Sequence, residues 1–242
     1  MADTITDSRA GARRFPRHVA VIMDGNGRWA EQRGLPRSAG HAAGAETFRR
    51  IATYCKDLGM DYLTVYAFST ENWKRSAEEV GAIMNLLKKY LLESIEKMER
   101  DRIRLKIIGD TSVLSPELRE LIDATDAIAA RLPGCFQANV CLNYGGRDEI
   151  VRAVKRFALS SPVSELTEDA MSASLDMGGI PDPDLIIRTG GEYRISNFLL
   201  WECAYSELLF SDVLWPDFSE KDVDAAVEDF ARRDRRYGGV KK

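Results

Sequence analysis

One stretch of the sequence combines a carboxylate, two glycines and an arginine in an order that suits phosphate binding. Residues 19–29 read V-A-V-I-M-D-G-N-G-R-W, so an apolar, partly β-branched run ends at Asp24 and the glycines follow within three positions. This order predicts a strand, a tight turn and a helix that starts near Arg28. Free N–H groups at a helix start favour an anion, and the Arg28 guanidinium adds positive charge. We therefore predict that this stretch binds a diphosphate, with a metal ion on Asp24.

Three further stretches repeat this design, because each is an apolar run that ends in polar and glycine residues. They are S-T-E-N-W-K-R at 69–75, N-Y-G-G-R at 143–147 and R-T-G-G-E-Y-R-I-S-N at 188–197. The carboxyl ends of parallel strands share one edge of a sheet, where α/β proteins hold ligands. Several arginines with a carboxylate indicate a polyanionic ligand bridged by Mg²⁺, although any single arginine could instead pair with a surface acid. The residues expected at this edge are Asp24, Asn26, Arg28, Ser69, Asn72, Arg75, Arg147, Arg188, Arg194 and Ser196.

Length and composition indicate an ordinary globular protein. The chain has 242 residues, of which 45% are apolar and 30% charged, enough for one large α/β domain or two small ones. The net charge of −4 gives no basic field for nucleic acid. No run approaches the 18 apolar residues of a transmembrane helix, and the N-terminus lacks the apolar region of a secretory signal. We expect a disordered tail at 1–15, one domain at 16–242 and a cytoplasmic location.

Histidine and cysteine content excludes other kinds of site. With only two histidines, His18 and His41, a histidine-rich zinc site is excluded and a Ser-His-Asp triad has few candidates. The four cysteines lack C-x-x-C spacing, so buried free thiols in a reducing compartment are expected.

The elements that must position these loops alternate between strand and helix patterns. Such alternation indicates βαβ units and therefore a single α/β domain with a central, mostly parallel six-stranded sheet flanked by helices. The segment 160–183 is expected to be irregular with one short helix, and the apolar segment 208–215 has no clear assignment. Strands are expected just before Asp24 and at 62–68, 104–108, 136–142, 184–188 and 198–201, and helices at 42–58, 77–102, 116–131, about 148–159 and 220–233.

The predicted helix at 77–102 has a wider apolar stripe than one buried face requires. Leu86, Tyr90 and Leu92 widen a regular i, i+3, i+4 pattern. The helix either packs on two sides or forms the wall of an apolar ligand cavity, and periodicity alone favours the first explanation. At its start, Ser76 to Glu79 form the capping box S-x-x-E, which by itself accounts for Glu79.

A dinucleotide-binding site is an alternative for the first stretch, because G-N-G-R-W-A matches the fingerprint G-x-G-x-x-A after a strand. Such a site needs an acid at the end of the second strand, about 20 residues further on. Glu46 lies near that distance but inside a predicted helix, and Asp24 would repel a pyrophosphate unless a metal ion intervened. We therefore discount an NAD-dependent oxidoreductase.

Taken in chain order, these loops resemble the cis-prenyltransferase family, most closely the bacterial undecaprenyl diphosphate synthases. The resemblance covers about residues 16–239, nearly the whole chain. The segments that carry it are H-V-A-V-I-M-D-G-N-G-R-W-A (18–30), G-H-x-x-G (40–44), Y-A-F-S-T-E-N-W-K-R (66–75), I-I-G-D (107–110), N-Y-G-G-R (143–147), D-L-I-I-R-T-G-G-E-Y-R-I-S-N-F-L-L-W (184–201) and E-L-L-F-S-D-V-L-W-P-D-F (207–218).

The resemblance implies a Mg²⁺-dependent chain-extending transferase. Isopentenyl diphosphate would be condensed onto an allylic diphosphate such as farnesyl diphosphate to give a cis-polyprenyl diphosphate. The expected product is undecaprenyl diphosphate for the lipid carrier of cell-wall synthesis. The apolar face of the helix at 77–102 then becomes a tunnel wall, which reverses the preference stated above. The resemblance also implies a homodimer, with R-R-Y-G-G (235–239) near the interface, and peripheral membrane contact through the lipid product.

The resemblance also assigns roles to individual residues. Asp24 would hold Mg²⁺ on the allylic diphosphate, and Glu207 would be the second metal ligand. Asn72 lies at a catalytic position, but a neutral amide is not a base near pH 7, so we expect it to orient a substrate. Replacing Asp24 by alanine is expected to abolish turnover with little change in thermal stability. The implied substrate-binding residues are Gly25, Asn26, Gly27, Arg28, Trp29, Arg37, His41, Ser69, Thr70, Glu71, Trp73, Arg75, Arg188, Arg194, Ile195 and Ser196.

Two alternatives concern the product and the activity. Phe136 and Leu142 are bulkier than the residues that long-chain relatives tend to have near the tunnel, which favours a shorter product, whereas Ala67 and the unbroken long helix favour a long one. A non-catalytic partner subunit of the same fold would lack the strand-end aspartate, so Asp24 favours catalysis. Tyr193 replaces a histidine that some relatives use for metal binding, and that role is not transferred to it.

Overall fold

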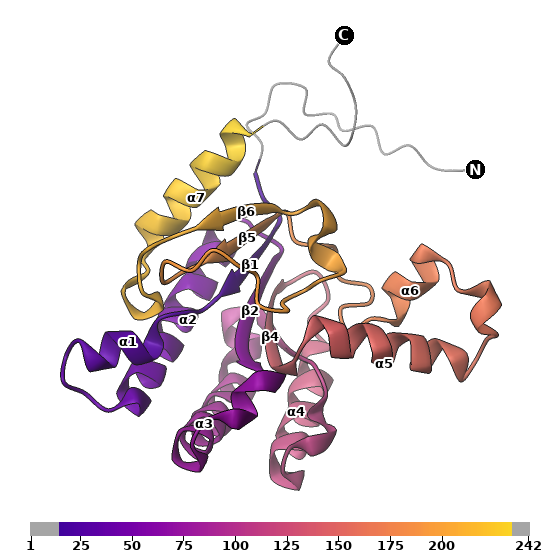
Figure 1. Cartoon of the computed structure of the whole chain (residues 1–242), viewed down its shortest axis with the longest axis horizontal. Helices are drawn as coiled ribbons and strands as arrows, with labels where there is room; N and C mark the ends of the chain where they lie inside the picture. The colour runs from indigo at the N-terminus through magenta and orange to yellow at the C-terminus, as the bar shows by residue number, and fades with distance from the viewer. Residues whose placement is uncertain (1–14, 234–242) are drawn as a thin grey trace.

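Six parallel strands form one sheet in the order β3-β4-β2-β1-β5-β6 in the computed structural model, which describes residues 15–233 (Figure 1). Every strand pairing in this sheet is parallel, which confirms the predicted fold class. The expected tail at 1–15, except Phe15, and the segment 235–239 lie outside the described residues. The strands are β1 (His18–Ile22), β2 (Tyr62–Ser69), β3 (Ile103–Ile108), β4 (Phe136–Tyr144), β5 (Leu185–Arg188) and β6 (Glu207–Phe210).

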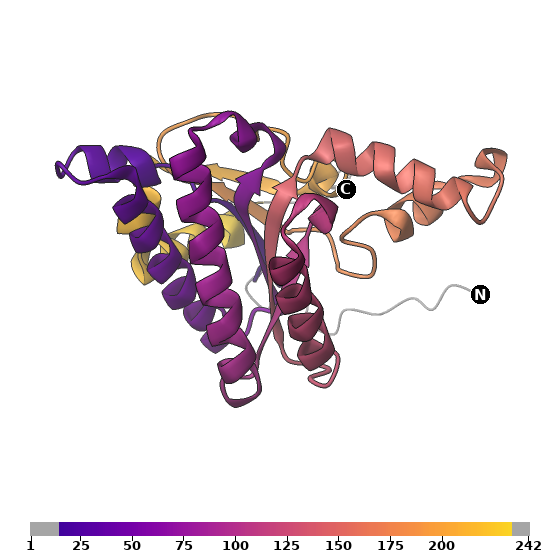
Figure 2. The ribbon, with the colours of Figure 1, turned by 90° about the horizontal axis from the view of Figure 1, so that it is seen from below.

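One group of helices covers one face of the sheet, and two further helices project away from it. In Figures 1 and 2, α2, α3 and α4 lie side by side, while α5 and α6 project away from the body of the sheet. Five short 3₁₀ turns complete the described elements, and the one at Thr70–Lys74 contains the polar loop after β2. The helices are α1 (Asn26–Glu31), α2 (Arg37–Asp57), α3 (Ala77–Asp101), α4 (Pro116–Ala129), α5 (Gly146–Ala158), α6 (Glu168–Ser174) and α7 (Glu220–Arg232).

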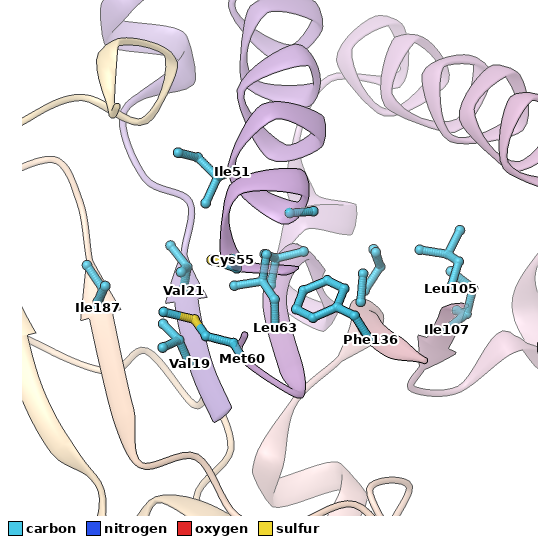
Figure 3. Packing of buried hydrophobic residues seen from close by; sticks show 14 of the residues in the cluster. Val19, Val21, Ile51, Cys55, Met60, Leu63, Leu105, Ile107, Phe136 and Ile187 are labelled. Carbon is cyan, nitrogen blue, oxygen red and sulfur yellow. The ribbon is translucent and has the colours of Figure 1, made fainter. Parts of the chain in front are cut away.

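The main core lies between the sheet and the helical layer formed by α2, α3, α4 and α7. Alternate strand residues such as Val19, Val21 and Leu63 point into it and meet Ile51 and Cys55 of α2 (Figure 3). Alternation with period two explains why one face of each strand is apolar toward these helices. Burial of apolar surface therefore fixes the strands and helices that flank the four strand-end loops.

The opposite face of the sheet carries a buried polar chain. The ring of His18 lies 2.6 Å from the Pro181 carbonyl oxygen and 2.7 Å from Thr64 Oγ1, and Asn139 Nδ2 donates to the same hydroxyl oxygen at 2.9 Å. Burial lowers the pKa of His18 to about 4, so the ring is neutral at pH 7. This chain joins β1, β2 and β4 on the face of the sheet opposite the main core.

Two sequence-based boundaries were wrong. Helix α2 begins at Arg37 rather than at 42, because Pro36 is its extended N-cap and its first turns contain few apolar residues that a periodicity could reveal. The last strand is Glu207–Phe210, not 198–201. Phe198 instead lies in a turn and stacks on Tyr66 with ring centroids 4.7 Å apart, so its burial does not require a strand.

Within residues 15–233, no helix has the length and apolar character needed to cross a bilayer.

Candidate active site

Four loops meet at the carboxyl edge of the sheet, as the sequence pattern predicted. Asp24 follows β1, Ser69 ends β2, Tyr144 ends β4 and Arg188 ends β5. Because β4, β2, β1 and β5 are adjacent and parallel, these ends lie next to one another. The fold thus brings together Asp24 and Arg188, which are 164 positions apart in the chain.

Asp24 lies at the centre of this edge between two guanidinium groups. Its carboxylate accepts a hydrogen bond from Arg188 Nη2 at 2.8 Å and another from Arg28 Nη2 at 3.2 Å. The backbone of Asp24 is held by Thr189, whose hydroxyl accepts from the Asp24 N–H at 3.0 Å and donates to its carbonyl oxygen at 2.8 Å. Sequence reasoning missed this role of Thr189, which no motif signals.

Arg188 is almost completely buried and is aimed by the loop that follows β5. Its side chain is 5% exposed, and Nη1 donates to the Arg194 carbonyl oxygen at 2.6 Å and to Ser196 Oγ at 2.7 Å. Ser196 has φ +50°, so the loop turns back over the guanidinium. The predicted group Asp24, Arg188 and Ser196 is therefore brought into direct contact.

The glycines of the first loop allow close approaches that a side chain would prevent. Gly25 has φ +108°, and a Cβ there would lie 2.8 Å from Leu214 Cδ2. A Cβ on Gly27 would lie 2.6 Å from the guanidinium of Arg37. The Arg37 guanidinium therefore rests against the backbone of the predicted diphosphate loop, in a position that only glycine permits at residue 27.

Glu79 at the start of α3 gathers three cationic or titratable side chains. Its carboxylate accepts from Arg75 Nη1 at 2.7 Å and Arg37 Nε at 3.2 Å, and lies 2.9 Å from His41 Nε2. Burial acts to raise the Glu79 pKa, but the hydrogen bonds from His41 and Arg75 and their positive surroundings outweigh it and hold the pKa below its usual value. Burial also lowers the pKa of His41, which leaves this ring neutral near pH 7.

The sequence-based explanation of Glu79 was incomplete. The backbone N–H of Glu79 does donate to Ser76 Oγ, as a helix cap, but its side chain turns to Arg37, His41 and Arg75. The spacing of Arg75 and Glu79, four residues apart at a helix start, is the only sequence signal for this contact. Two cationic groups therefore flank the loop after β1, one around Arg188 and the other around Glu79.

The loop after β2 is fixed by its own side chains. Asn72 Oδ1 accepts from the Ser69 N–H at 3.1 Å, so this amide oxygen caps the 3₁₀ turn rather than facing an open site. Trp73 Nε1 donates to Asn143 Oδ1 at 2.7 Å, and Asn197 Nδ2 donates to Glu71 at 3.2 Å. Thr70 also lies close to the loop after β4. Gly145 has no side chain, and a Cβ added to it would lie only 2.9 Å from the Thr70 hydroxyl oxygen. These contacts tie three of the four loops together.

The remaining predicted residues are less central. Arg194 is exposed and pairs with Glu192. Ile195 packs against a separate cluster of buried apolar residues that includes Ile22 and Phe198. Trp29 turns away from the strand ends and donates through Nε1 to Asp217 at 2.7 Å. Asn26 is half-buried with no hydrogen-bond partner for Oδ1 among the described residues, and it lies against Gly44 of α2.

Glu207 does not join this group within one chain. It is the first residue of β6, and the strand register pairs it with Leu185, which itself pairs with Val19, five residues before Asp24. At about 3.3 Å per residue, Glu207 and Asp24 are about 16 Å apart along the strands. Glu207 instead forms an ion pair with Arg233 at 3.2 Å. The two carboxylates of one chain therefore cannot bind the same metal ion.

A cavity of about 220 Å³ begins beside these loops and runs between the sheet and helices α2 and α3. Asn26 and His41 line the end of the cavity that is near the loops. Asp101 and Ile103 line its other end, where α3 ends and β3 begins. Its walls are mainly apolar side chains of both helices and of β2, β3 and β4, together with Met23 just after β1. Leu142 and Ala67 line it, whereas Phe136 is buried in the core and does not. Of the three residues that widen the stripe of α3, Leu86 and Tyr90 line the cavity, whereas Leu92 does not and is 45% exposed.

The donor set suits Mg²⁺ only if a ligand supplies further oxygens. Among residues 15–233, no cluster of three or more His, Cys, Asp or Glu side chains could hold a metal ion. Asp24 is 30% exposed and stands alone as a carboxylate among arginines. Mg²⁺ is commonly held by one or two carboxylates together with phosphate oxygens and water, so Asp24 fits a site completed by a diphosphate.

These features describe a parallel α/β domain with an arginine-rich site at the strand ends beside an apolar cavity. A sequence profile of the family described as "Putative undecaprenyl diphosphate synthase" matches residues 22–238. The isoprenyl transferase of Brucella suis biovar 1 (strain 1330) is 50% identical over 231 residues, covering 93% of this chain and 90% of that protein. The isoprenyl transferase of Aquifex aeolicus (strain VF5) is 49% identical over 227 residues, with 94% and 97% covered.

Solved structures agree with these relatives. Lavandulyl diphosphate synthase from Lavandula x intermedia, crystallised with dimethylallyl diphosphate, has a TM-score of 0.86 at 32% identity and covers 93% of this chain and 98% of its own. A probable undecaprenyl diphosphate synthase from Campylobacter jejuni has a TM-score of 0.79 at 35% identity, with 93% and 99% covered. The chain belongs to the cis-prenyltransferase family and is a prenyltransferase enzyme.

Proposed function

We propose that this enzyme extends an allylic diphosphate with isopentenyl diphosphate, in the presence of Mg²⁺, to make undecaprenyl diphosphate for a cell-wall lipid carrier. The observation that carries the proposal is the junction of Asp24 and two arginine groups with the mouth of a long apolar cavity. The arginine groups suit two diphosphates, and the cavity suits a growing polyprenyl chain.

The allylic diphosphate is assigned to the loop after β1. Backbone N–H groups of residues 25–28 would face it. Arg37, His41 and Arg75 all contact Glu79 and would supply further polar groups beside this loop. Its hydrocarbon tail would enter the cavity past Asn26, which lines the cavity and packs against Gly44. Isopentenyl diphosphate is assigned to Arg188, Arg194 and Ser196 on the other side of Asp24.

In the proposed reaction the allylic C–O bond breaks and its electron pair leaves with the diphosphate. The double bond of isopentenyl diphosphate supplies the electrons of the new C–C bond, and loss of a proton forms the cis double bond. Arg28 and Arg37 stabilise the negative charge that develops on the departing diphosphate. The loop at 69–75 excludes water through its contacts with Asn143 and Asn197, and Asn72 orients rather than deprotonates a substrate.

Asp24 is the residue that would hold Mg²⁺, and the ion would supply charge neutralisation of the allylic diphosphate as a leaving group. The carboxylate is already placed between Arg28 and Arg188, so it stands at the boundary of both proposed head-group sites. Glu207 of the same chain has no part in this proposal.

We also propose a homodimer and peripheral contact with the membrane through the lipid product. β6 is an edge strand of the sheet, and Leu208 on it and Tyr205 before it are exposed apolar surfaces. Sedimentation that shows a monomer at micromolar concentration would contradict the dimer.

The test is chromatography of the products formed from farnesyl diphosphate, isopentenyl diphosphate and Mg²⁺. The wild-type chain is expected to give an eleven-unit product, and Asp24→Asn is expected to reduce turnover at least about 100-fold. Asp61→Asn is the matched control. Asp61 pairs with Arg17 at the opposite edge of the sheet, so this variant should retain activity. Absence of any condensation by the wild type would refute the function, whereas a shorter product would refute only the chain length.

A further inference from the structure

Between α2 and α3 the lining of the cavity includes charged side chains as well as apolar ones. The sheet forms its inner wall, and its outer side is the line along which α2 and α3 lie next to each other (Figure 2). Along this line the lining includes Arg49, Glu93 and Lys97. The side chains of Arg49 and Lys97 are 42% and 38% exposed, so at this level the cavity approaches solvent.

Several contacts join the two helices here, and we call them the α2–α3 seam. The Arg49 guanidinium pairs with the Glu93 carboxylate, which also lies 3.4 Å from Lys97 Nζ. The Tyr90 hydroxyl donates to Glu46 at 2.7 Å, and the Arg49 guanidinium lies 4.9 Å from the centre of the Tyr90 ring. The seam therefore consists of two polar cross-links between α2 and α3 at the side of an apolar cavity.

The seam lies between two other contacts that join the same helices. Near the loops, Glu79 on α3 binds Arg37 and His41 on α2. At the other end, Lys56 Nζ of α2 donates to the Asp101 carbonyl oxygen of α3 at 3.2 Å. Partly exposed ion pairs contribute little to folding stability, so parting the middle of the seam costs far less than separating two apolar helix faces.

We propose that the Arg49–Glu93 pair is a gate that sets how far the product chain can grow. The inference rests on the proposed function: new units are added at the head group, so the tail is pushed from the strand ends toward Asp101. When the cavity is full, growth continues only if the tail leaves sideways between α2 and α3. A closed seam confines the tail, and an opened seam lets it pass.

The test is a charge reversal at the seam. Glu93→Lys places a fourth positive charge beside Arg49, Lys89 and Lys97 and is expected to open the seam by repulsion. We expect the fraction of products longer than the main wild-type product to rise about threefold, the size of change that a surface ion pair produces in an equilibrium. Arg49→Glu alone should act in the same direction, and the double variant Arg49→Glu, Glu93→Lys should restore the wild-type distribution.

The control is Glu117→Lys, which breaks an ion pair between Lys88 of α3 and α4 at a position that does not line the cavity. If Glu93→Lys does not fold, Glu93→Gln removes the charge with little change in shape and should lengthen the products to a smaller extent. The same distribution in all seam variants, or in the single and double variants alike, overturns the gate. Failure of the wild type to condense isopentenyl diphosphate would instead refute the proposed function, so the two failures are distinguishable.

Discussion

At the scale of single residues, Asp24 has a structural role beside its proposed catalytic one. Its partner Arg188 is 5% exposed, so removing the carboxylate leaves a buried guanidinium with one lost partner. The sequence led us to expect little effect on thermal stability, and the structure changes that expectation. We now expect Asp24→Ala to lower the free energy of unfolding by about 2 kcal/mol, less than for a fully buried pair because Asp24 itself is 30% exposed. Asp24→Asn keeps an acceptor and should lose less, and equal thermal midpoints for all three chains would contradict this account.

Glu202 provides a second residue-scale prediction, this time for pH dependence. Its side chain is 2% exposed, and neither carboxyl oxygen has a hydrogen-bond partner among the described residues. Burial, together with the neighbouring Glu149 carboxyl, raises its pKa from 4.5 to about 8. The folded state therefore binds a proton more tightly than the unfolded state, so this stability is complete below pH 4.5 and is lost as the pH rises through about 8.

The measurement is the thermal midpoint across that pH range. Glu202→Gln cannot ionise, so its midpoint should fall less than that of the wild type between pH 4.5 and about 8. Glu96→Gln, at an exposed position on α3, should leave the wild-type slope unchanged. A wild-type slope in the Glu202 variant would show that another group titrates.

At the scale of elements, the contact of α1 with α2 depends on glycine. A Cβ on Gly40 would lie 2.0 Å from the Asn26 carbonyl oxygen, which is backbone and cannot move without shifting α1. Gly40→Ala should therefore lower the free energy of unfolding by about 2 kcal/mol through overpacking. It should also reduce turnover, because Asn26 belongs to the proposed diphosphate loop.

Gly81 supplies the control for that prediction, since it lies in the helix α3 with open space around its Cβ position. Gly81→Ala should stabilise the chain by about 0.5–1 kcal/mol, the difference in helix propensity between the two residues. Urea unfolding of both variants measures these changes. A stabilising effect of both substitutions would mean that α1 and α2 are not closely packed at Gly40.

At the scale of the whole molecule, the cavity predicts how product length responds to its volume. Ala67 of β2 lines the cavity, and its small side chain leaves room for a chain that passes along the sheet. Ala67→Leu should fill part of this space and shorten the main product. Ala42→Leu adds the same atoms at an exposed position on α2 and should leave the product unchanged. Chromatography of the products decides, and an unchanged length for Ala67→Leu would place the growing chain elsewhere.

Local patterns in the sequence were enough to predict the fold class and the four strand-end loops. Hydrophobic period and turn residues are local signals, so the strands before Asp24 and Ser69 and the long helix α3 were placed close to their observed bounds. Parallel topology then required these loops to meet at one edge, where Arg188 contacts both Asp24 and Ser196. The family resemblance supplied the substrates and most of the residue roles.

Which side chains meet within that edge depends on how distant segments pack, and the structure was needed to show it. It placed Glu207 at the opposite end of the sheet, joined Glu79 to Arg37, His41 and Arg75, and replaced the expected strand at 198–201 by a buried turn. The volume of the cavity and its polar seam also depend on how α2 and α3 sit against the sheet. Such features arise from strand register and side-chain packing between segments far apart in the chain, and no local pattern of residues encodes them.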